Sequence, residues 1–590
     1  MKTLRKSLPA LFLFSMFFHG QVSCHTADST GQKYSFREKL YMTTDRDIYI
    51  AGEKMLLRIF NTDGSGPSSG ALSKVIYLDV LDKPGNPAIQ VKINYDGRLG
   101  SAAVNLPDTL STGNYLIRAY TSWMQNFPED LFGYRVISVI NPFKELSNIT
   151  DSPPDDTISN KLSSRDVEPG LFNNPGDKAI ELRILTDKDI YGKREKVRLD
   201  LSVTCPEGKS EQADLSVSVI KSFLSDNDLN SLTGNAGNDR KNPDLSGNPR
   251  HLPEPEGLLI KGTIYNKSTD EPLKDTDISL SMVGKKARCQ FMKTNSEGGF
   301  IFVLKDFTGL KEIVIQPLEP VPAGTYVELQ NQFLETYTST GIPSFRFDSV
   351  SAGLINNTVI AMQINKIYES EIPGKRSDTI AAVHNFFGNP VRTIRISDFI
   401  ELSDIREVVK EIIPEVVLFR KDRQPALKVI SSNPYQIFNN QALVLLDGVP
   451  VNDIDKLLSI SARELESVEI INSRYFYADY VFEGIISFIT KKGKLSSLEE
   501  TNSFFRQVFE GCLEREDFYS PAYDSDSAML SRIPDFRNTL FWKSDVIVTD
   551  DETAEIEFYT SDEAAEYIIV AEGFTSEGKR IRSTLPLIVK

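Results

Sequence analysis

One short pattern occurs twice in this sequence, and it constrains the fold more than any other feature. Thr44–Tyr49 reads TDRDIY and Thr186–Tyr191 reads TDKDIY, and a Glu-Lys pair follows each at the same offset of 142 residues. A repeat at a fixed offset indicates two copies of one folding unit. Both copies open stretches in which apolar and polar residues alternate between closely spaced turns, which is typical of half-buried strands in a β-sandwich. The sequence therefore predicts two β-sandwiches of the same kind.

The composition agrees with a mainly β protein of several domains. The chain has 590 residues, of which 40% are hydrophobic and 25% are charged, enough for about four or five globular domains. Its 35 glycines and 30 prolines supply turns between many short strands. The formal net charge of −16 at pH 7 argues against nucleic acids and anionic membranes as main partners.

Residues 1–24 have the composition of an export signal. Three basic residues precede an apolar core at Leu8–Phe18, which is too short to span a bilayer. Val-Ser-Cys then resembles the end of a bacterial lipobox, although Gln21 stands where that pattern prefers Leu. The resemblance implies a lipid on Cys24 and a place at the outer membrane, facing the periplasm or the cell surface. Ordinary signal cleavage is the alternative.

The sequence holds no recognisable catalytic or metal-binding pattern. Beyond Cys24 the cysteines are three and widely separated, and no Cys or His spacing suggests zinc. The four histidines have no partner at triad spacing, and GxSxG, HExxH and phosphate-loop patterns are absent. We therefore expect no metal, no cofactor and no enzymatic activity.

The two repeat copies occupy residues 33–146 and 179–256, separated by a polar linker at 147–178. TDRDIYIAGEKM from Thr44 and GNYLIRAYTSW from Gly113 resemble macroglobulin-like domains, which occur in α2-macroglobulins and in bacterial envelope proteins. The reactive thioester motif of that family, Cys-Gly-Glu-Gln, is absent, so the resemblance implies no covalent trap.

Two further segments belong to the second copy in this interpretation. Residues 226–255 are polar and rich in Asn, Gly and Asp, and we expect a disordered loop there. Residues 321–384 hold a β-like stretch that could complete the second sandwich, followed by a linker. Within that linker, Asp378–Val383 is similar to a TonB box, which adds a strand to TonB by β-augmentation, with a plain linker as the alternative.

The pattern changes at residue 257. Residues 257–320 carry Gly262-Thr-Ile, Pro272-Leu and then TNSEGGFIF from Thr294. These features resemble the carboxypeptidase regulatory-like domain, a small β-sandwich found ahead of the plug in many Bacteroidetes receptors. The resemblance implies a spacer or docking module and no peptidase, since no HxxE zinc pattern exists in the chain.

Residues 385–494 carry the most specific motifs of the chain. LVLLDGVP from Leu443, ESVEI from Glu466 and GIISFITKKG from Gly484 follow one another. This order resembles the plug domain of TonB-dependent outer-membrane receptors, most closely those of Bacteroidetes. It implies a small α+β domain in which the following residues are structural: Asp447, Gly448, Pro450, Gly484 and Gly493.

A receptor surrounds its plug with a membrane β-barrel, and this chain departs from that plan. After Gly493 only 97 residues remain, too few for such a barrel. Residues 505–590 are instead expected to form one more β-sandwich. A plug without a barrel suggests docking on another outer-membrane protein, either a TonB-dependent transporter or the barrel-assembly machinery.

Two groups of side chains are candidate sites. One is an aromatic cluster in the expected loop before the last strand of the plug-like domain, which either anchors a partner or fills a local core. Its members are Tyr475, Phe476, Tyr477, Tyr480 and Phe482. The other is the repeated acidic pair, Asp45 with Asp47 and Asp187 with Asp189, which suggests acid–base work, calcium binding or only a solvated turn.

Taken together, the sequence predicts a mainly β chain of tandem sandwiches with one small α+β domain. Its expected function is a non-enzymatic, outer-membrane-associated scaffold that docks on a β-barrel. The alternative is a nutrient-binding or protease-sensing surface lipoprotein built on the macroglobulin-like domains.

Overall fold

The structure is a computed structural model, and it describes residues 38–62, 72–144, 180–205, 208–225, 249–319, 321–322, 324–335, 342, 345, 349–368, 384–421, 424–432, 435–495, 505–549 and 553–590. The expected signal with Cys24, the linker at 147–178 and the segment Asp378–Val383 lie outside these ranges, as do residues 226–248 of the expected disordered loop. Residues 249–255 of that loop are described, and Glu254 is buried and hydrogen-bonded, so disorder is the wrong expectation there. The mainly β class predicted from the sequence is confirmed, with paired sheets forming sandwiches and one smaller α+β unit.

The described residues of the first sandwich form eight strands in two sheets. The three-stranded sheet has the order β1 (Leu40–Thr44), β3 (Lys54–Asn61), β6 (Gly100–Asn105). The five-stranded sheet has the order β2 (Ile48–Ile50), β8 (Gly133–Ile140), β7 (Gly113–Tyr120), β4 (Val75–Leu81), β5 (Pro87–Asn94). β2 runs parallel to β8, and every other pair is antiparallel. The 3-10 helices η1 (Trp123–Asn126) and η2 (Glu129–Leu131) join β7 to β8.

The second sandwich repeats this strand order with strands from two distant parts of the chain. Its three-stranded sheet is β9 (Glu181–Thr186), β11 (Lys196–Thr204), β30 (Ala554–Tyr559). Its five-stranded sheet is β10 (Ile190–Tyr191), β32 (Arg580–Val589), β31 (Glu566–Thr575), β12 (Ala213–Lys221), β29 (Thr539–Val548). β10 is parallel to β32, as β2 is to β8. Strands β9–β12 thus correspond to β1–β4, and β29–β32 correspond to β5–β8.

This arrangement corrects two expectations. Residues 505–590 do not form a separate C-terminal sandwich, because β29–β32 complete the second sandwich. Residues 321–384 do not complete that sandwich either, since β19 (Thr325–Leu329) pairs with a strand of the third sandwich. Alternation of apolar and polar residues reveals a strand but not its partner, and neighbours in sequence are the usual partners. An insertion of more than 300 residues breaks that rule.

The third sandwich also draws on two parts of the chain. One sheet pairs β13 (Leu258–Asn266) with β14 (Glu271–Pro272), β17 (Gly299–Leu304) and β19. The other has the order β16 (Arg288–Lys293), β15 (Asp277–Met282), β18 (Leu310–Pro317), β28 (Phe505–Glu510). Its last strand therefore lies well outside the expected range of 257–320.

The α+β unit lies within residues 385–495. Its mixed sheet is β20 (Arg392–Arg395), β26 (Leu465–Tyr477), β27 (Tyr480–Thr490), β24 (Leu443–Leu446), β25 (Val449–Pro450). A second sheet is β21 (Val416–Lys421), β22 (Gln424–Ser432), β23 (Tyr435–Ile437). The helices are α4 (Ile405–Glu411), α5 (Ile454–Leu458), η5 (Ile396–Asp398) and η6 (Ala462–Glu464). The expected loop before the last strand is instead the tip of a long β26–β27 hairpin.

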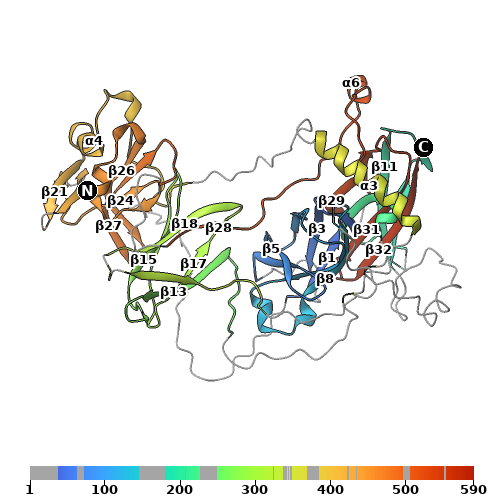
Figure 1. The fold of residues 1–590 in the computed structure, drawn as a ribbon, viewed down its shortest axis with the longest axis horizontal. Helices are drawn as coiled ribbons and strands as arrows, with labels where there is room; N and C mark the ends of the chain where they lie inside the picture. Colours follow the sequence, from blue (N-terminus) through green and yellow to red (C-terminus); the bar gives the residue numbers. More distant parts are fainter. Residues whose placement is uncertain are drawn as a thin grey trace, which may run out of the picture.

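The domains are inserted one inside another, and the molecule has two lobes (Figure 1). The third sandwich follows β12 and precedes β29, so it interrupts the second sandwich, and η3 (Ser222–Leu224) begins this insertion. The α+β unit lies between β19 and β28, so it interrupts the third sandwich. In the first sandwich, the corresponding strands β4 and β5 are joined by the short turn Asp82–Asn86. The α+β unit and the first two sandwiches stand at opposite ends of the molecule.

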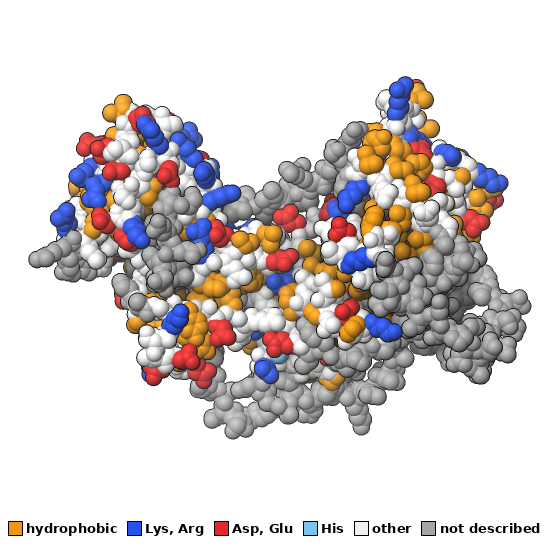
Figure 2. Space-filling view, in the orientation of Figure 1, with side chains coloured by type: hydrophobic (Ala, Val, Ile, Leu, Met, Phe, Trp, Pro, Cys, Tyr) orange, Lys and Arg blue, Asp and Glu red, His pale blue; other side chains and the backbone are white. Residues whose placement is uncertain are grey.

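Helix α3 (Ser349–Tyr368) is the longest helix in the described part of the chain, in a region where the sequence suggested a strand. Its Val, Ile and Thr residues favour strands, but packing decides its conformation. Val359 is buried against Ile50 and Ile140 of the first sandwich, with Ile355 and Met362 beside it. Hydrophobic side chains also gather on the surface of the lobe that carries α3 (Figure 2). The short helix α6 (Asp526–Met529) projects from the same lobe.

The first and third sandwiches share one continuous apolar core. At their junction the Tyr77 hydroxyl donates a hydrogen bond of 3.0 Å to Glu254. Lys92 Nζ donates to the Glu510 carbonyl at 2.8 Å, and Cys512 bridges β5 to the turn before β18. These contacts hold the middle of the molecule together.

Candidate interaction surfaces

The Asp447-Gly448 turn is buried and joins the α+β unit to the third sandwich. The Asp447 carboxylate accepts hydrogen bonds from the N–H and hydroxyl of Thr490, both 2.7 Å, and from the Leu495 N–H at 3.0 Å. Across the junction, the Gly284 N–H donates to the Asp447 carbonyl and Cys289 Sγ donates to the Gly448 carbonyl, both at 2.9 Å. The turn therefore has a structural role in two domains at once.

The other residues of the plug-like motif also lie at tight contacts. Gly448 has φ +81°, and a Cβ there would stand 3.2 Å from the Met282 carbonyl oxygen. Gly484 has φ +91°, and a Cβ there would meet Val429 at 2.7 Å. The Pro450 carbonyl accepts a hydrogen bond from Gln316 at 2.6 Å, and the Gly493 N–H donates to Thr490 at 2.9 Å. These contacts need glycine or a fixed backbone.

Four of the five candidate aromatic residues fill a core between the α+β unit and the third sandwich. The ring centroid of Phe291, from β16, lies 4.9 Å from Phe482, 5.2 Å from Tyr477 and 5.9 Å from Tyr480. Tyr475 packs beside them and donates a hydrogen bond of 2.6 Å to the Phe386 carbonyl. This side of the hairpin is thus occupied within the molecule.

Phe476 is the fifth aromatic residue, and it faces the other way. It is 68% exposed and stands directly opposite Val481, which is 53% exposed, so both lie on the outer face of the hairpin. The strand β23 also presents apolar side chains, since Tyr435 is 82% and Ile437 is 52% exposed. Among the described strands β23 pairs only with β22, which leaves one edge open. An open edge with apolar side chains is a pairing site for another chain.

The repeated acidic residues form the same internal contacts in both sandwiches. Asp45 accepts a hydrogen bond from the Tyr49 hydroxyl at 2.7 Å and from the Leu56 N–H at 3.0 Å. Asp187 accepts from Tyr191 at 2.7 Å and from the Arg198 N–H at 2.8 Å. In both copies, therefore, an aspartate carboxylate joins the second strand to the third by hydrogen bonds. Asp45 and Asp47 are buried, because the second sandwich covers them, so the expected solvated turn is wrong for the first copy.

The interface between the first two sandwiches is rich in buried charge. Arg135 pairs with Asp47 at 2.7 Å, and Arg58 pairs with Asp214 at 2.6 Å. Tyr41 donates a hydrogen bond to Glu572 of β31. Burial alone would raise the pKa of Glu572, but Arg580, Arg582 and Arg135 lower it to about 2. The charges are paired, and the Arg58–Asp214 ion pair and the Tyr41–Glu572 hydrogen bond join one sandwich to the other.

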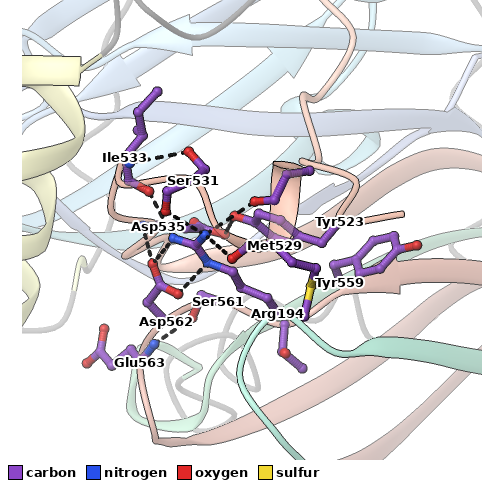
Figure 3. A network of polar contacts seen from close by, with 12 residues as sticks. Arg194, Tyr523, Met529, Ser531, Ile533, Asp535, Tyr559, Ser561, Asp562 and Glu563 are labelled. Atoms are coloured by element: carbon purple, nitrogen blue, oxygen red, sulfur yellow. Dashed lines mark hydrogen bonds and ion pairs between the residues drawn. The ribbon is translucent and has the colours of Figure 1, made fainter. Parts of the chain in front are cut away.

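Arg194 clamps an extended loop to the second sandwich (Figure 3). Its guanidinium forms a two-point contact with Asp562, at 2.6 and 2.7 Å. It also donates to the carbonyls of Met529 at 3.0 Å, Ser531 at 2.8 Å and Ile533 at 3.0 Å. Because the planar guanidinium has five donors, one side chain can hold this whole loop.

The clamped loop displays an apolar tip. Leu530 is 80% exposed and Met529 is 44% exposed. The sequence signal for the clamp is that Arg194 occupies the place of Gly52 in the first repeat copy. In the structure Arg194 has φ +53° and Gly52 has φ +95°. Arginine in a conformation that favours glycine indicates that its side chain has a specific task.

Neither a metal site nor a spanning helix is found in the described part of the chain. No group of three or more His, Cys, Asp or Glu side chains there is placed to hold a metal ion. No helix within the described ranges is long and apolar enough to cross a membrane.

No family model and no curated protein matches this chain. Among solved structures it is similar to Escherichia coli alpha-2-macroglobulin activated by porcine elastase, with a TM-score of 0.23 and 10% identity over 94% of this chain and 44% of that one. It is also similar to Salmonella alpha-2-macroglobulin reacted with methylamine, with a TM-score of 0.23 and 9% identity over 94% of this chain and 39% of that one. For the D0-D1 domain of intimin, the TM-score is 0.13 and the identity is 10% over 46% of this chain and 88% of that one. The chain spans less than half of either macroglobulin chain, and likeness at these scores assigns it neither a family nor an activity.

Proposed function

We propose that this chain is a non-enzymatic scaffold of the bacterial cell envelope that binds an outer-membrane β-barrel protein through its α+β unit. The nested insertion is the observation that carries this proposal. Because of this insertion, the α+β unit lies at one end of the molecule, carried by the third sandwich and opposite the first two. The resemblance of LVLLDGVP and GIISFITKKG to a receptor plug supports a barrel protein as the partner.

The exposed surface of the α+β unit supports a binding role. One side of the unit is fixed by Phe291 and by the Asp447-Gly448 turn. Large apolar side chains remain exposed on its other surfaces: Val391, Phe399, Ile400, Tyr435, Ile437, Phe476 and Val481. Exposed aromatic and aliphatic residues are the usual anchors of protein interfaces.

A pulldown from native outer membranes in mild detergent, read by mass spectrometry, tests this function. The wild-type chain is expected to retain one β-barrel protein at near-equal stoichiometry. Tyr435→Asp combined with Ile437→Asp, and Phe476→Asp separately, change exposed positions only and leave the fold intact. At least one of the two variants should recover roughly tenfold less barrel protein, as loss of an anchor predicts.

A matched control distinguishes contact from misfolding. Leu310→Asp changes an equally exposed residue of the third sandwich, 71% exposed, and should leave barrel recovery unchanged. Recovery of the chain alone, or equal recovery by wild type and both α+β variants, would overturn the proposal.

A further inference from the structure

Helix α3 has an outer face without charge on a strongly acidic protein. One quarter of the chain is charged, so twenty residues of average composition would carry about five charges, but α3 carries only Lys366. Its outer face, at the spacing i, i+3, i+4, i+7, consists of Gly353, Asn356, Asn357, Ile360, Gln363, Ile364 and Ile367. Ile360 is 46% and Ile367 is 72% exposed. A surface helix normally turns charged residues outward, so this face has the composition of an interface.

The inner face of α3 is already occupied. Val359 is buried against the first sandwich, and its neighbours Thr358 and Ala361 are also buried. Asn365 donates a hydrogen bond of 3.1 Å to the Phe536 carbonyl, which fixes the C-terminal half of the helix to the segment before β29. The helix is therefore fixed to the molecule through its inner face, and its uncharged face points outward.

We propose that the outer face of α3 binds the same face of a second copy of this chain, as two antiparallel helices related by a two-fold axis. The order of residues supports this partner. With the axis at Ile360, each Ile360 meets its counterpart, Gly353 faces Ile367 and Asn357 faces Gln363. The absence of a side chain at Gly353 then makes room for Ile367. The side-chain amides of Asn357 and Gln363 face each other, and each can both donate and accept a hydrogen bond.

The space and the charge at α3 fit this arrangement. A Cβ at Gly353 would meet no atom within 4 Å, so the incoming Ile367 side chain has room. Two copies with a net charge of −16 each repel one another, and contact is least costly where neither carries charge. A two-fold interface brings identical surfaces together, which makes an uncharged face the suitable one.

Molar mass by light scattering or sedimentation of the full chain tests this inference. The wild type is expected at twice the mass of one chain, and Ile360→Asp at the mass of one chain with an unchanged circular dichroism spectrum. Leu310→Asp, at a 71% exposed site of the third sandwich, is the matched control and should remain dimeric. The mass does not depend on any barrel protein, so it can fail or succeed independently of the proposed function.

A pair of double variants then tests the register. Asn357→Glu with Gln363→Glu places like charges opposite each other and should abolish the dimer. Asn357→Lys with Gln363→Glu replaces the same two residues with opposite charges and should restore it. A wild type with the mass of one chain at every concentration, a dimer that survives Ile360→Asp, or equal behaviour of the two double variants would overturn the proposal.

Discussion

Glu254 is a buried carboxyl group at the junction of the first and third sandwiches. It accepts hydrogen bonds from the Tyr77 hydroxyl and the Leu259 N–H, both on the same oxygen. Its other oxygen has no hydrogen-bond partner. Burial raises the pKa of Glu254 to about 7 from its ordinary value of 4.5. Between pH 4.5 and about 7, the Glu254 carboxyl group is therefore protonated in the folded protein and ionised in the unfolded chain.

We expect this proton to make folding stability fall with rising pH. Because the folded state binds more protons between pH 4.5 and 7, stability decreases across that window and levels off above it. Glu254→Gln keeps the accepting oxygen and should remove up to about 3 kcal/mol of this decrease. Urea unfolding from about pH 5 to about pH 8 measures the effect. Glu256→Gln, at an exposed site, is the control, and an unchanged pH slope in Glu254→Gln would contradict the prediction.

Arg194 allows a test of the clamp at the level of one side chain. Arg194→Gly keeps a backbone suited to φ +53° but removes every contact to the loop, at a cost of about 2 kcal/mol. We expect the segment from Tyr523 to Ile533 to be cut faster by proteases and to lose hydrogen-exchange protection. Arg194→Lys retains the charge without the fork, so it should recover only part of the protection. Protection equal to wild type in both variants would show that the loop is held by other contacts.

Among the elements, the β26–β27 hairpin packs on the third sandwich around one buried ring. Phe291 is buried and contacts Tyr477, Tyr480 and Phe482. Phe291→Ala leaves a cavity and should cost about 3–5 kcal/mol. We expect this substitution to weaken the packing of the α+β unit on the third sandwich, which would appear as faster hydrogen exchange in β26 and β27. Phe476→Ala, on the exposed face of the same hairpin, should change stability by no more than about 0.5 kcal/mol. Equal effects of the two variants would mean that the ring cluster does not hold the unit.

The elements also show how far local sequence reasoning reaches. The repeat at Thr44 and Thr186 predicted two sandwiches, because side-chain periodicity is a local property of each strand. The same periodicity could not predict that β12 pairs with β29, since about 320 residues separate them. Helix α3 looked like a strand because its β-branched residues were assessed without the first sandwich that packs on it.

The candidate site shows the same limit. Asp447 and Gly448 were predicted to be structural residues, and the structure places them in a buried turn, whose residue preferences are local. The aromatic residues at 475–482 were noticed as a group, but the sequence could not say which face they share. Pairing across the hairpin decides it, with Phe476 on one side and Tyr475 and Tyr477 on the other. Arg194 was missed because its partners lie more than 330 residues away.

For the whole molecule, the split second sandwich predicts that a cut chain stays together. A site for a sequence-specific protease placed between Leu224 and Arg250 would divide the molecule into two fragments. We expect both fragments to elute as one species in gel filtration, because β12 of the first pairs with β29 and β31 of the second. They should separate in urea and re-form the complex on its removal. Separate elution under native conditions would contradict the strand order described above.

The same split has a consequence in time. At about 5–20 residues per second, a ribosome needs roughly 16–64 seconds to move from the end of β12 to the start of β29. During that interval β12, a strand buried along its whole length in the finished protein, lacks both of its neighbours. The first half of the second sandwich must therefore wait, while the third sandwich and the α+β unit are completed ahead of it. Until β29 and β31 have been made, the nascent chain exposes β12 without a pairing partner and depends on its being shielded.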